Sequence, residues 1–304
     1  MSDYSVIGKR VHRIDGTEKV TGNAKYTFDL VLPNMLYGKI LRSPHPHAKI
    51  INIDTTPAEK MIGVKAVVTG KDTLGRKNGI WRRFSELCDE EILCRTKVRY
   101  VGDPVAAVAA IDEDTAEEAC QLIKVEYEEL PAAFDPLEAI KEDAPQIHEG
   151  VELNINVTRH IEWGDVDEAF KHCDYIREDQ FKTSSQHHVC METHNAVASF
   201  DYNGKLTVWT STQSSYYIQR LLADMLGLRE GNIRVINPHT GGGFGSKFEL
   251  DSAQFCASLL SMKLCRPVKI VLTRAEEFTA TKRRTPMYYF VKLGAKKDGT
   301  FLAK

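Results

Sequence analysis

The sequence predicts a mixed α/β (α+β) fold, on three observations made within one stretch of the chain. Residues 104–110 are almost wholly apolar, which is typical of a buried strand. Acidic residues at 112–114 then begin a helical pattern that continues to Ile123, as the helix dipole favours. Residues 125–127 return as a strand. A strand, a helix and a strand in direct succession form one unit of a layered α/β domain.

The elements before this unit complete a first domain, for which we expect the bounds 1–135. Residues 1–35 form an irregular lead-in, because Gly8, Gly16, Gly22 and Pro33 interrupt any regular period. Short strand-like runs follow at 36–41, 48–53 and 64–68.

A charged stretch at 136–157, which contains Pro145 and Gly150, is expected to be a linker. A second domain then covers 158–304, with alternating helical and strand patterns. We predict helices at 168–173, 216–226 and 250–262, and strands at 175–181, 195–200, 206–209, 233–236 and 268–272.

The last residues indicate an unfinished sheet. Residues 287–293 alternate like a strand, Lys297-Asp298-Gly299 is a hairpin turn signal, and residues 300–304 begin a return strand. A domain rarely finishes a few residues into a hairpin arm. We therefore expect either a fragment of a longer polypeptide or a separate chain that completes the sheet.

Composition excludes several classes of function. The 304 residues are 42% hydrophobic and 27% charged with a net charge of −2, so the chain has no general attraction for nucleic acid or membrane lipid. The basic pairs Arg76-Lys77 and Arg82-Arg83 are expected to be solvated surface. No apolar run approaches the roughly 18 residues of a membrane span, and the start lacks a signal-peptide pattern. A cytoplasmic location is expected.

The cysteines also limit the chemistry. Seven are scattered along the chain and none forms a Cys-x-x-Cys pair, which argues against an iron–sulfur cluster held by this chain. His188, Cys190, Glu192 and His194 would share one face if their segment were extended. Adjacent same-face positions lie too far apart to share one ion, however, so we predict a buried polar strand here and no metal ligand.

The most informative motif is Thr240-Gly241-Gly242-Gly243-Phe244-Gly245-Ser246-Lys247, which follows the predicted strand at 233–236. Successive glycines let a backbone approach another group closely, and Phe244 would be a wall beside that group. A following helix start would add free N–H donors. The spacing fits neither a P-loop nor a dinucleotide-binding fingerprint, so nucleotide binding is not expected. Gln213, at the end of another strand, offers both a donor and an acceptor.

Several stretches, in this order, carry a family resemblance. They are residues 15–27, 42–48 and 98–106 in the first domain, and Met191-Glu192, Ser211-Thr212-Gln213 and residues 241–245 in the second. Together they resemble the molybdenum-binding subunit of the xanthine dehydrogenase/aldehyde oxidase family, nearest its 4-hydroxybenzoyl-CoA reductase and nicotinate dehydrogenase branches. The resemblance implies an N-terminal α/β hammerhead domain followed by the start of a molybdopterin-binding domain that is incomplete in this chain.

The resemblance also implies roles for particular residues. Gln213 matches the glutamine that hydrogen-bonds an oxo ligand of molybdenum. Gly242, Gly243, Phe244 and Gly245 match the loop beside the cofactor. Phe244 and Phe248 would line the substrate pocket; a phenylalanine at 248 replaces a purine-holding glutamate and suits an aromatic or acyl substrate. The base glutamate of the family lies beyond residue 304, so no catalytic residue is expected in this chain.

The implied function is a molybdenum hydroxylase-type oxidoreductase acting on an aromatic, N-heterocyclic or aldehyde substrate, inactive as this chain alone. Its cofactor would be molybdopterin, in the cytosine dinucleotide form, with molybdenum. FAD and [2Fe-2S] clusters would lie on partner subunits or domains, so the expected partners are an iron–sulfur subunit, an FAD subunit and the remainder of the molybdenum subunit. The alternative is a non-catalytic scaffold or assembly module that keeps the hammerhead fold.

Overall fold

The structure, a computed structural model, describes residues 4–79 and 88–304. Its centre is a seven-stranded sheet in the order β10-β9-β8-β11-β1-β5-β3. The strands are β1 (Leu36–Arg42), β3 (Val64–Thr69), β5 (Pro104–Ala110), β8 (Asn195–Phe200), β9 (Leu206–Thr210), β10 (Ile233–Ile236) and β11 (Val268–Val271). The predicted mixed α/β class is confirmed.

This sheet contains strands from both predicted domains. β1 pairs in parallel with β11, where Leu36 lies opposite Val268, and antiparallel with β5 on its other side. The stretch at 136–157 holds only two short helices, α4 (Pro136–Ala139) and η4 (Glu152–Asn154). It connects parts of the chain that share one sheet, and the domain bounds drawn around it stay a prediction.

β5 shows why the sheet forms the core. All seven of its residues are buried. Ala107 and Ala109 face one cluster of apolar side chains, which includes α6 (Ser215–Leu226) and α7 (Ser252–Leu264). Ala106 and Val108 face another, which includes α3 (Glu113–Leu122) and α2 (Thr56–Glu59). Since alternate residues of a strand point to opposite faces, helices on both sides require the continuous apolar run seen in the sequence.

Two of the helices begin directly after a residue whose side chain caps their N-terminus. The Asp112 side chain accepts a hydrogen bond from the Thr115 amide at 2.7 Å and caps α3, which begins within the acidic run where a helix was predicted. A capping box of Thr273 and Glu276 begins α8 (Arg274–Thr279), a helix absent from the sequence-based prediction. The lead-in, expected to be irregular, contains the short helices α1 (Gly16–Val20) and η1 (Thr27–Asp29).

A second sheet has three strands. Its order is β4-β2-β6, from β4 (Lys97–Val98), β2 (Ala48–Asp54) and β6 (Lys124–Glu129). A connecting 3-10 turn, η2 (Gly70–Asp72), follows β3, and η5 (Glu230–Asn232) precedes β10. The predicted surface pair Arg82-Arg83 lies outside the described residues.

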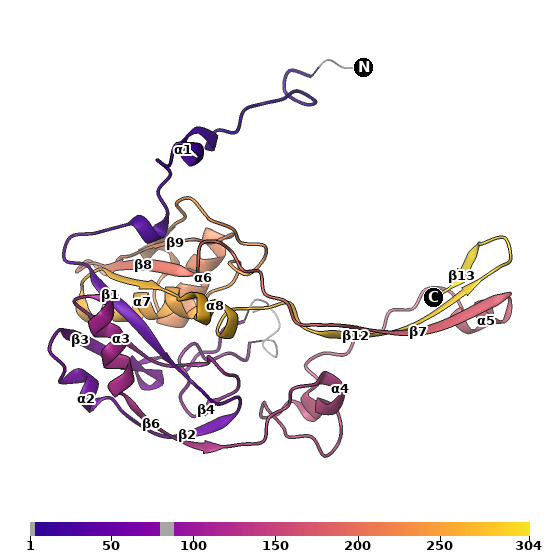
Figure 1. The fold of residues 1–304 in the computed structure, drawn as a ribbon, viewed down its shortest axis with the longest axis horizontal. Helices are drawn as coiled ribbons and strands as arrows, with labels where there is room; N and C mark the ends of the chain where they lie inside the picture. Colours follow the sequence, from indigo (N-terminus) through magenta and orange to yellow (C-terminus); the bar gives the residue numbers. More distant parts are fainter. Residues whose placement is uncertain (1–3, 80–87) are drawn as a thin grey trace.

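The remaining strands form an arm that projects from the body of the molecule (Figure 1). β7 (Tyr175–Thr183) and β12 (Met287–Ala295) pair antiparallel along nine residues, and β13 (Phe301–Ala303) pairs with the end of β12 after the predicted hairpin turn. Helix α5 (Val166–Lys171) lies at the tip of this arm. Within the described part of the chain, no helix has the length and apolar character needed to cross a membrane.

Candidate functional site

The glycine loop follows β10 and has the backbone geometry that its composition predicts. Gly242 and Gly245 have φ angles of +105° and +100°, which side chains rarely permit. Phe244 stands between them with φ of +50°, in the left-handed region that bulky residues seldom adopt. The loop is therefore a specific, strained turn rather than a flexible connection.

The loop packs directly against Gln213, which lies three residues after the end of β9. The main-chain amide of Gly245 donates a hydrogen bond to Gln213 Oε1 at 2.8 Å. The main-chain amide of Gln213 donates to the Lys247 carbonyl at 2.9 Å. A Cβ atom on Gly243 would lie 2.7 Å from Gln213 Cδ, closer than real Cβ atoms come. Glycine at 243 is what allows the two segments to touch.

These contacts orient the Gln213 side chain. Because Oε1 accepts the Gly245 hydrogen bond, the amide nitrogen Nε2 is left as the group that points elsewhere, and it makes no hydrogen bond within residues 4–79 and 88–304. Gln213 and Gly245 are exposed, and so is Phe244, at 74%. The three residues together present one amide donor, one bare stretch of backbone and one aromatic ring to the surface.

Phe248 lies further along the same loop, and its ring packs on a different element from the loop itself. Its ring stacks on Tyr217 of α6, with ring centroids 5.5 Å apart and an angle of 24° between the planes. Phe248 remains 38% exposed. Tyr217 was not singled out in the sequence, since nothing local distinguishes it from any aromatic residue on a helix.

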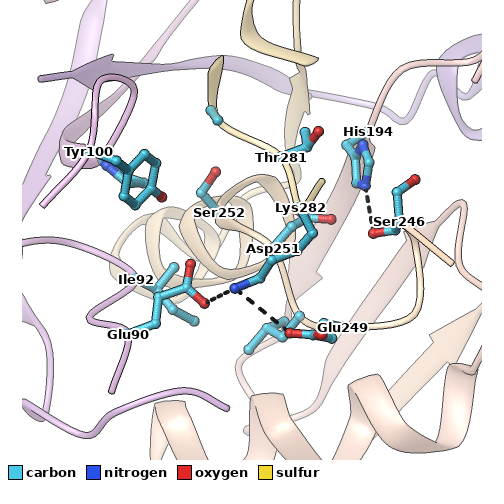
Figure 2. Close-up of a pocket in the computed structure, with 13 residues that line it drawn as sticks. Glu90, Ile92, Tyr100, His194, Ser246, Glu249, Asp251, Ser252, Thr281 and Lys282 are labelled. Atoms are coloured by element: carbon cyan, nitrogen blue, oxygen red, sulfur yellow. Dashed lines mark hydrogen bonds and ion pairs between the residues drawn. The ribbon is translucent and has the colours of Figure 1, made fainter. Parts of the chain in front are cut away.

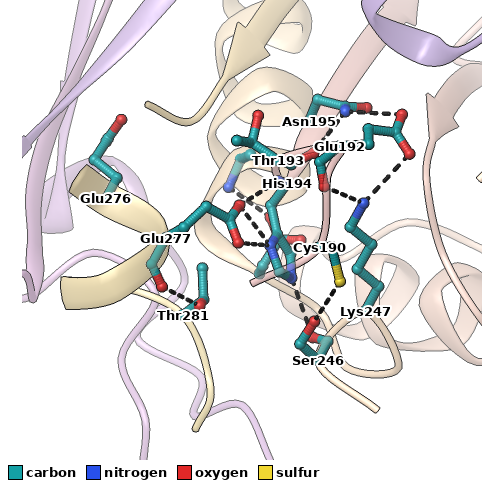
Figure 3. Close-up of polar contacts among 12 residues, drawn as sticks. Cys190, Glu192, Thr193, His194, Asn195, Ser246, Lys247, Glu276, Glu277 and Thr281 are labelled. Carbon is teal, nitrogen blue, oxygen red and sulfur yellow. Dashed lines mark hydrogen bonds and ion pairs between the residues drawn. The ribbon is translucent and has the colours of Figure 1, made fainter. Parts of the chain in front are cut away.

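Behind the loop, Lys247 is fully buried, and this position excludes any phosphate-binding role for it. Its Nζ donates to the Glu192 carbonyl at 2.8 Å and lies 3.3 Å from Glu192 Oε2 (Figure 3). Glu192 Oε2 also accepts from the Gly241 amide at 2.7 Å. One carboxylate therefore contacts residues at both ends of the loop.

A second buried pair lies next to the first. His194 Nδ1 is 2.8 Å from Glu277 Oε1, and His194 Nε2 is 3.1 Å from the Ser246 carbonyl. Burial opposes the charged form of His194, but the hydrogen bond to Glu277 and the nearby Asp251 carboxylate raise its pKa above the ordinary value. Burial likewise opposes the charged form of Glu277, but His194 holds the pKa of Glu277 below its usual range. The imidazolium form explains how both ring nitrogens donate.

The segment that holds Glu192 and His194 is not the extended strand that we expected. β8 begins only at Asn195, and Val189 has a positive φ of 46°. Cys190 Sγ instead lies 3.7 Å from Ser246 Oγ, so the side chains of the segment have separate partners. In the described ranges, no cluster of three His, Cys, Asp or Glu side chains could hold a metal ion.

The helix after the loop does not offer the free N–H donors that we expected. α7 begins at Ser252, and Asp251 Oδ1 accepts from the amides of Ala253 and Gln254 at 2.8 and 3.0 Å. The helix N-terminus is thus already capped.

A small cavity of about 70 Å³ lies beside this cap (Figure 2). Lys282 Nζ is 2.9 Å from Glu90 and 3.8 Å from Glu249 at its edge. Burial raises the pKa of Asp251, whose Oδ2 atom is buried and has no hydrogen-bond partner in the part of the chain that is described. Neither Gln213, Phe244 nor Phe248 lines this cavity, so it is separate from the exposed face of the loop.

The fold is the combination of two known domain types. A family model of the aldehyde oxidase and xanthine dehydrogenase a/b hammerhead domain matches residues 21–131, and one of the molybdopterin cofactor-binding domain matches residues 147–304. These matches define a class of oxidoreductase subunits that bind a molybdopterin cofactor.

Individual relatives agree with this class. The chain is 41% identical to the nicotinate dehydrogenase large molybdopterin subunit of Eubacterium barkeri, over 99% of this chain and 69% of that protein. It is 35% identical to a xanthine dehydrogenase molybdenum-binding subunit of Escherichia coli, over 95% of this chain and 39% of that protein. The solved structure of reconstituted CO dehydrogenase from Oligotropha carboxidovorans superposes with a TM-score of 0.87 at 32% identity, over 97% of this chain and 38% of that chain.

The chain belongs to the aldehyde oxidase and xanthine dehydrogenase family of molybdopterin-dependent oxidoreductases. It spans 69% of the nicotinate dehydrogenase protein, 39% of the xanthine dehydrogenase protein and 38% of the CO dehydrogenase chain.

Proposed function

We propose that the exposed face formed by Gln213 and the glycine loop contacts molybdopterin in a molybdenum hydroxylase-type oxidoreductase. One observation carries this proposal: the Gly245 amide donates to Gln213 Oε1, which leaves Nε2 of this exposed residue as a donor for an oxygen acceptor. A donor beside bare backbone fits a cofactor rich in oxygen atoms. The bound group would supply the redox chemistry; Gln213 would orient it, and Gly242, Gly243, Phe244 and Gly245 would allow its close approach.

The substrate class follows from the aromatic side chains around this face. Phe244 is exposed, and the partly exposed Phe248 stacks on Tyr217, so the loop carries uncharged aromatic rings at these positions. Such walls suit the planar or apolar part of an aromatic, N-heterocyclic or aldehyde substrate. Relatives are named for nicotinate, xanthine and nicotine.

The rest of the proposal concerns what the chain works with. The cofactor is proposed in its cytosine dinucleotide form, with FAD and [2Fe-2S] clusters on partner subunits or domains. Further polypeptide, either a continuation of this chain or a separate subunit, would complete the cofactor site and supply the base glutamate. A cytoplasmic location is part of the same proposal.

The test measures molybdenum and pterin per mole of the natively purified complex. Gln213→Ala is expected to lower activity or cofactor affinity about 10- to 100-fold, since Gln213 acts on the cofactor's ligands. Gly243→Ala is expected to lower cofactor content too, because its Cβ would collide with Gln213.

Gln219→Ala is the matched control, because the Gln219 side chain donates to the carbonyls of Glu230 and Ile233, away from the glycine loop. It should retain full cofactor content. A native complex with intact partners and no molybdenum would instead favour the scaffold alternative.

A further inference from the structure

The glycine loop is held on the side away from its exposed face by charged side chains that are buried or nearly buried. Lys247 is fully buried, and the Glu192 side chain is only 9% exposed. Both belong to the cluster of polar contacts in Figure 3, whereas Phe244 and Gln213 of the same site are exposed. The contacts of Gln213 with Gly243 and Gly245 at the exposed face do not require a charged side chain at 192 or 247.

The geometry ties both ends of the loop to Glu192. Its Oε2 accepts from the Gly241 amide at 2.7 Å and lies 3.3 Å from Lys247 Nζ, while its carbonyl accepts from the same Nζ at 2.8 Å. Its Oε1 accepts from Asn195 Nδ2 at 3.1 Å, at the start of β8. The carboxylate is therefore anchored to the sheet while it holds residues 241 and 247.

His194 adds a third attachment, at Ser246. Its Nε2 donates to the Ser246 carbonyl, and its Nδ1 faces Glu277 of α8. The loop is thus attached to the start of β8 and to α8 through side chains that are almost fully buried, since His194 is 1% and Glu277 5% exposed. Movement of Gly241, Ser246 or Lys247 would break a charge-assisted hydrogen bond in a low-dielectric interior.

We propose that Glu192 and Lys247 are positioning residues, which hold the glycine loop in the conformation that cofactor binding needs. Burying an ammonium and a carboxylate costs free energy that a neutral apolar pair would not, so stability alone does not favour this arrangement. Ligand binding does favour a buried ion pair that fixes the loop, because a preorganised site spends less of its binding free energy on ordering. This role rests on the proposed function, in which the opposite face of the loop contacts molybdopterin.

The first experiment has a readout other than cofactor content or activity. Hydrogen–deuterium exchange is measured on residues 241–247 in the native complex, for the wild type, Lys247→Met and Lys269→Met. Lys269 is the matched control: it is also buried and donates to main-chain carbonyls, of Phe28 and Leu30, but lies on β11. Lys247→Met should speed exchange in the loop by about tenfold or more, with Lys269→Met unchanged there. Unchanged exchange in the loop of Lys247→Met overturns the proposal.

The second experiment separates positioning from general stability. Glu192→Gln combined with Lys247→Met removes both charges, so no unpaired buried charge remains and the melting temperature should recover relative to Lys247→Met. Molybdenum content per folded protein should stay low, because the loop remains loose. Recovery of molybdenum together with stability would show a merely structural role and overturn the proposal. If the wild type holds no molybdenum, the proposed function is wrong. If hydrogen–deuterium exchange in its loop still depends on Lys247, the role of Glu192 and Lys247 in holding the loop is nevertheless supported.

Discussion

Strands of the seven-stranded sheet and of the projecting arm are both paired along their length, but they differ in how far their residues are buried. In the sheet, β5 has no exposed residue, because helices cover both of its faces. In the arm, β7 pairs with β12 along nine residues, yet eight of the nine residues of β7 are exposed. Large apolar side chains on the arm reach solvent, among them Tyr175, Ile176, Phe181, Phe290 and Phe301.

The difference shows that strand pairing and apolar burial contribute separately to the stability of the fold. The arm is held by main-chain hydrogen bonds and by α5 at its tip, whereas the body is held by apolar burial between layers. The candidate site belongs to the body, and its fixed geometry depends on that core.

The largest expected effect on the free energy of unfolding comes from a substitution in the apolar core of the body. Phe255 on α7 is 1% exposed and belongs to the apolar cluster between the helices and the sheet. Phe255→Ala should lower the free energy of unfolding by about 3–5 kcal/mol, because a large side chain is replaced by a cavity. Urea denaturation followed by circular dichroism measures this change. A loss below about 1 kcal/mol would contradict the assignment of the core.

A smaller effect, with a pH signature, comes from the buried pair of His194 and Glu277. The raised pKa of His194 gives stability that is present below pH 6.5 and lost as pH rises through its folded pKa. The lowered pKa of Glu277 gives stability that is present above pH 4.5 and lost as pH falls through its folded pKa. Glu277→Gln should therefore cost most between these values, about 3 kcal/mol, because it leaves a buried charge unpaired.

Denaturation of wild type and variant from acidic to alkaline pH, through both of these values, measures that cost. Glu178→Gln is the control on the arm, where Glu178 pairs with Lys292 at 2.9 Å in an exposed position. Its effect should be negligible at every pH, since solvent screens such pairs. Equal effects at the two sites would remove the distinction between body and arm.

The smallest effect is expected on the arm's apolar surface. Phe290 on β12 is 69% exposed. Phe290→Ser should change the free energy of unfolding by no more than about 0.5 kcal/mol, as surface substitutions usually do. The same denaturation assay measures it, and a loss comparable with that of Phe255→Ala would mean that the arm has a core of its own.

Local pattern predicted most of the elements, because the forces that select them act within a few residues. The apolar run of β5 and the acidic start of α3 were read from the sequence with bounds close to those of the structure. The capping box of Thr273 and Glu276 was equally visible, and α8 could have been predicted from it. The segment at 188–194 misled us, since its alternation suggested a strand where the chain is irregular.

The glycines at 242 and 245, where φ is positive, and the side-chain amide of Gln213 could be recognised from the amino-acid sequence. The contacts of Glu192 with Gly241 and Lys247, and the pairing of β1 with β11, became visible only in the folded chain. The two kinds of feature depend on interactions of different range along the chain. Backbone conformation depends on neighbouring residues, whereas a buried ion pair or a sheet order depends on which distant surfaces pack together.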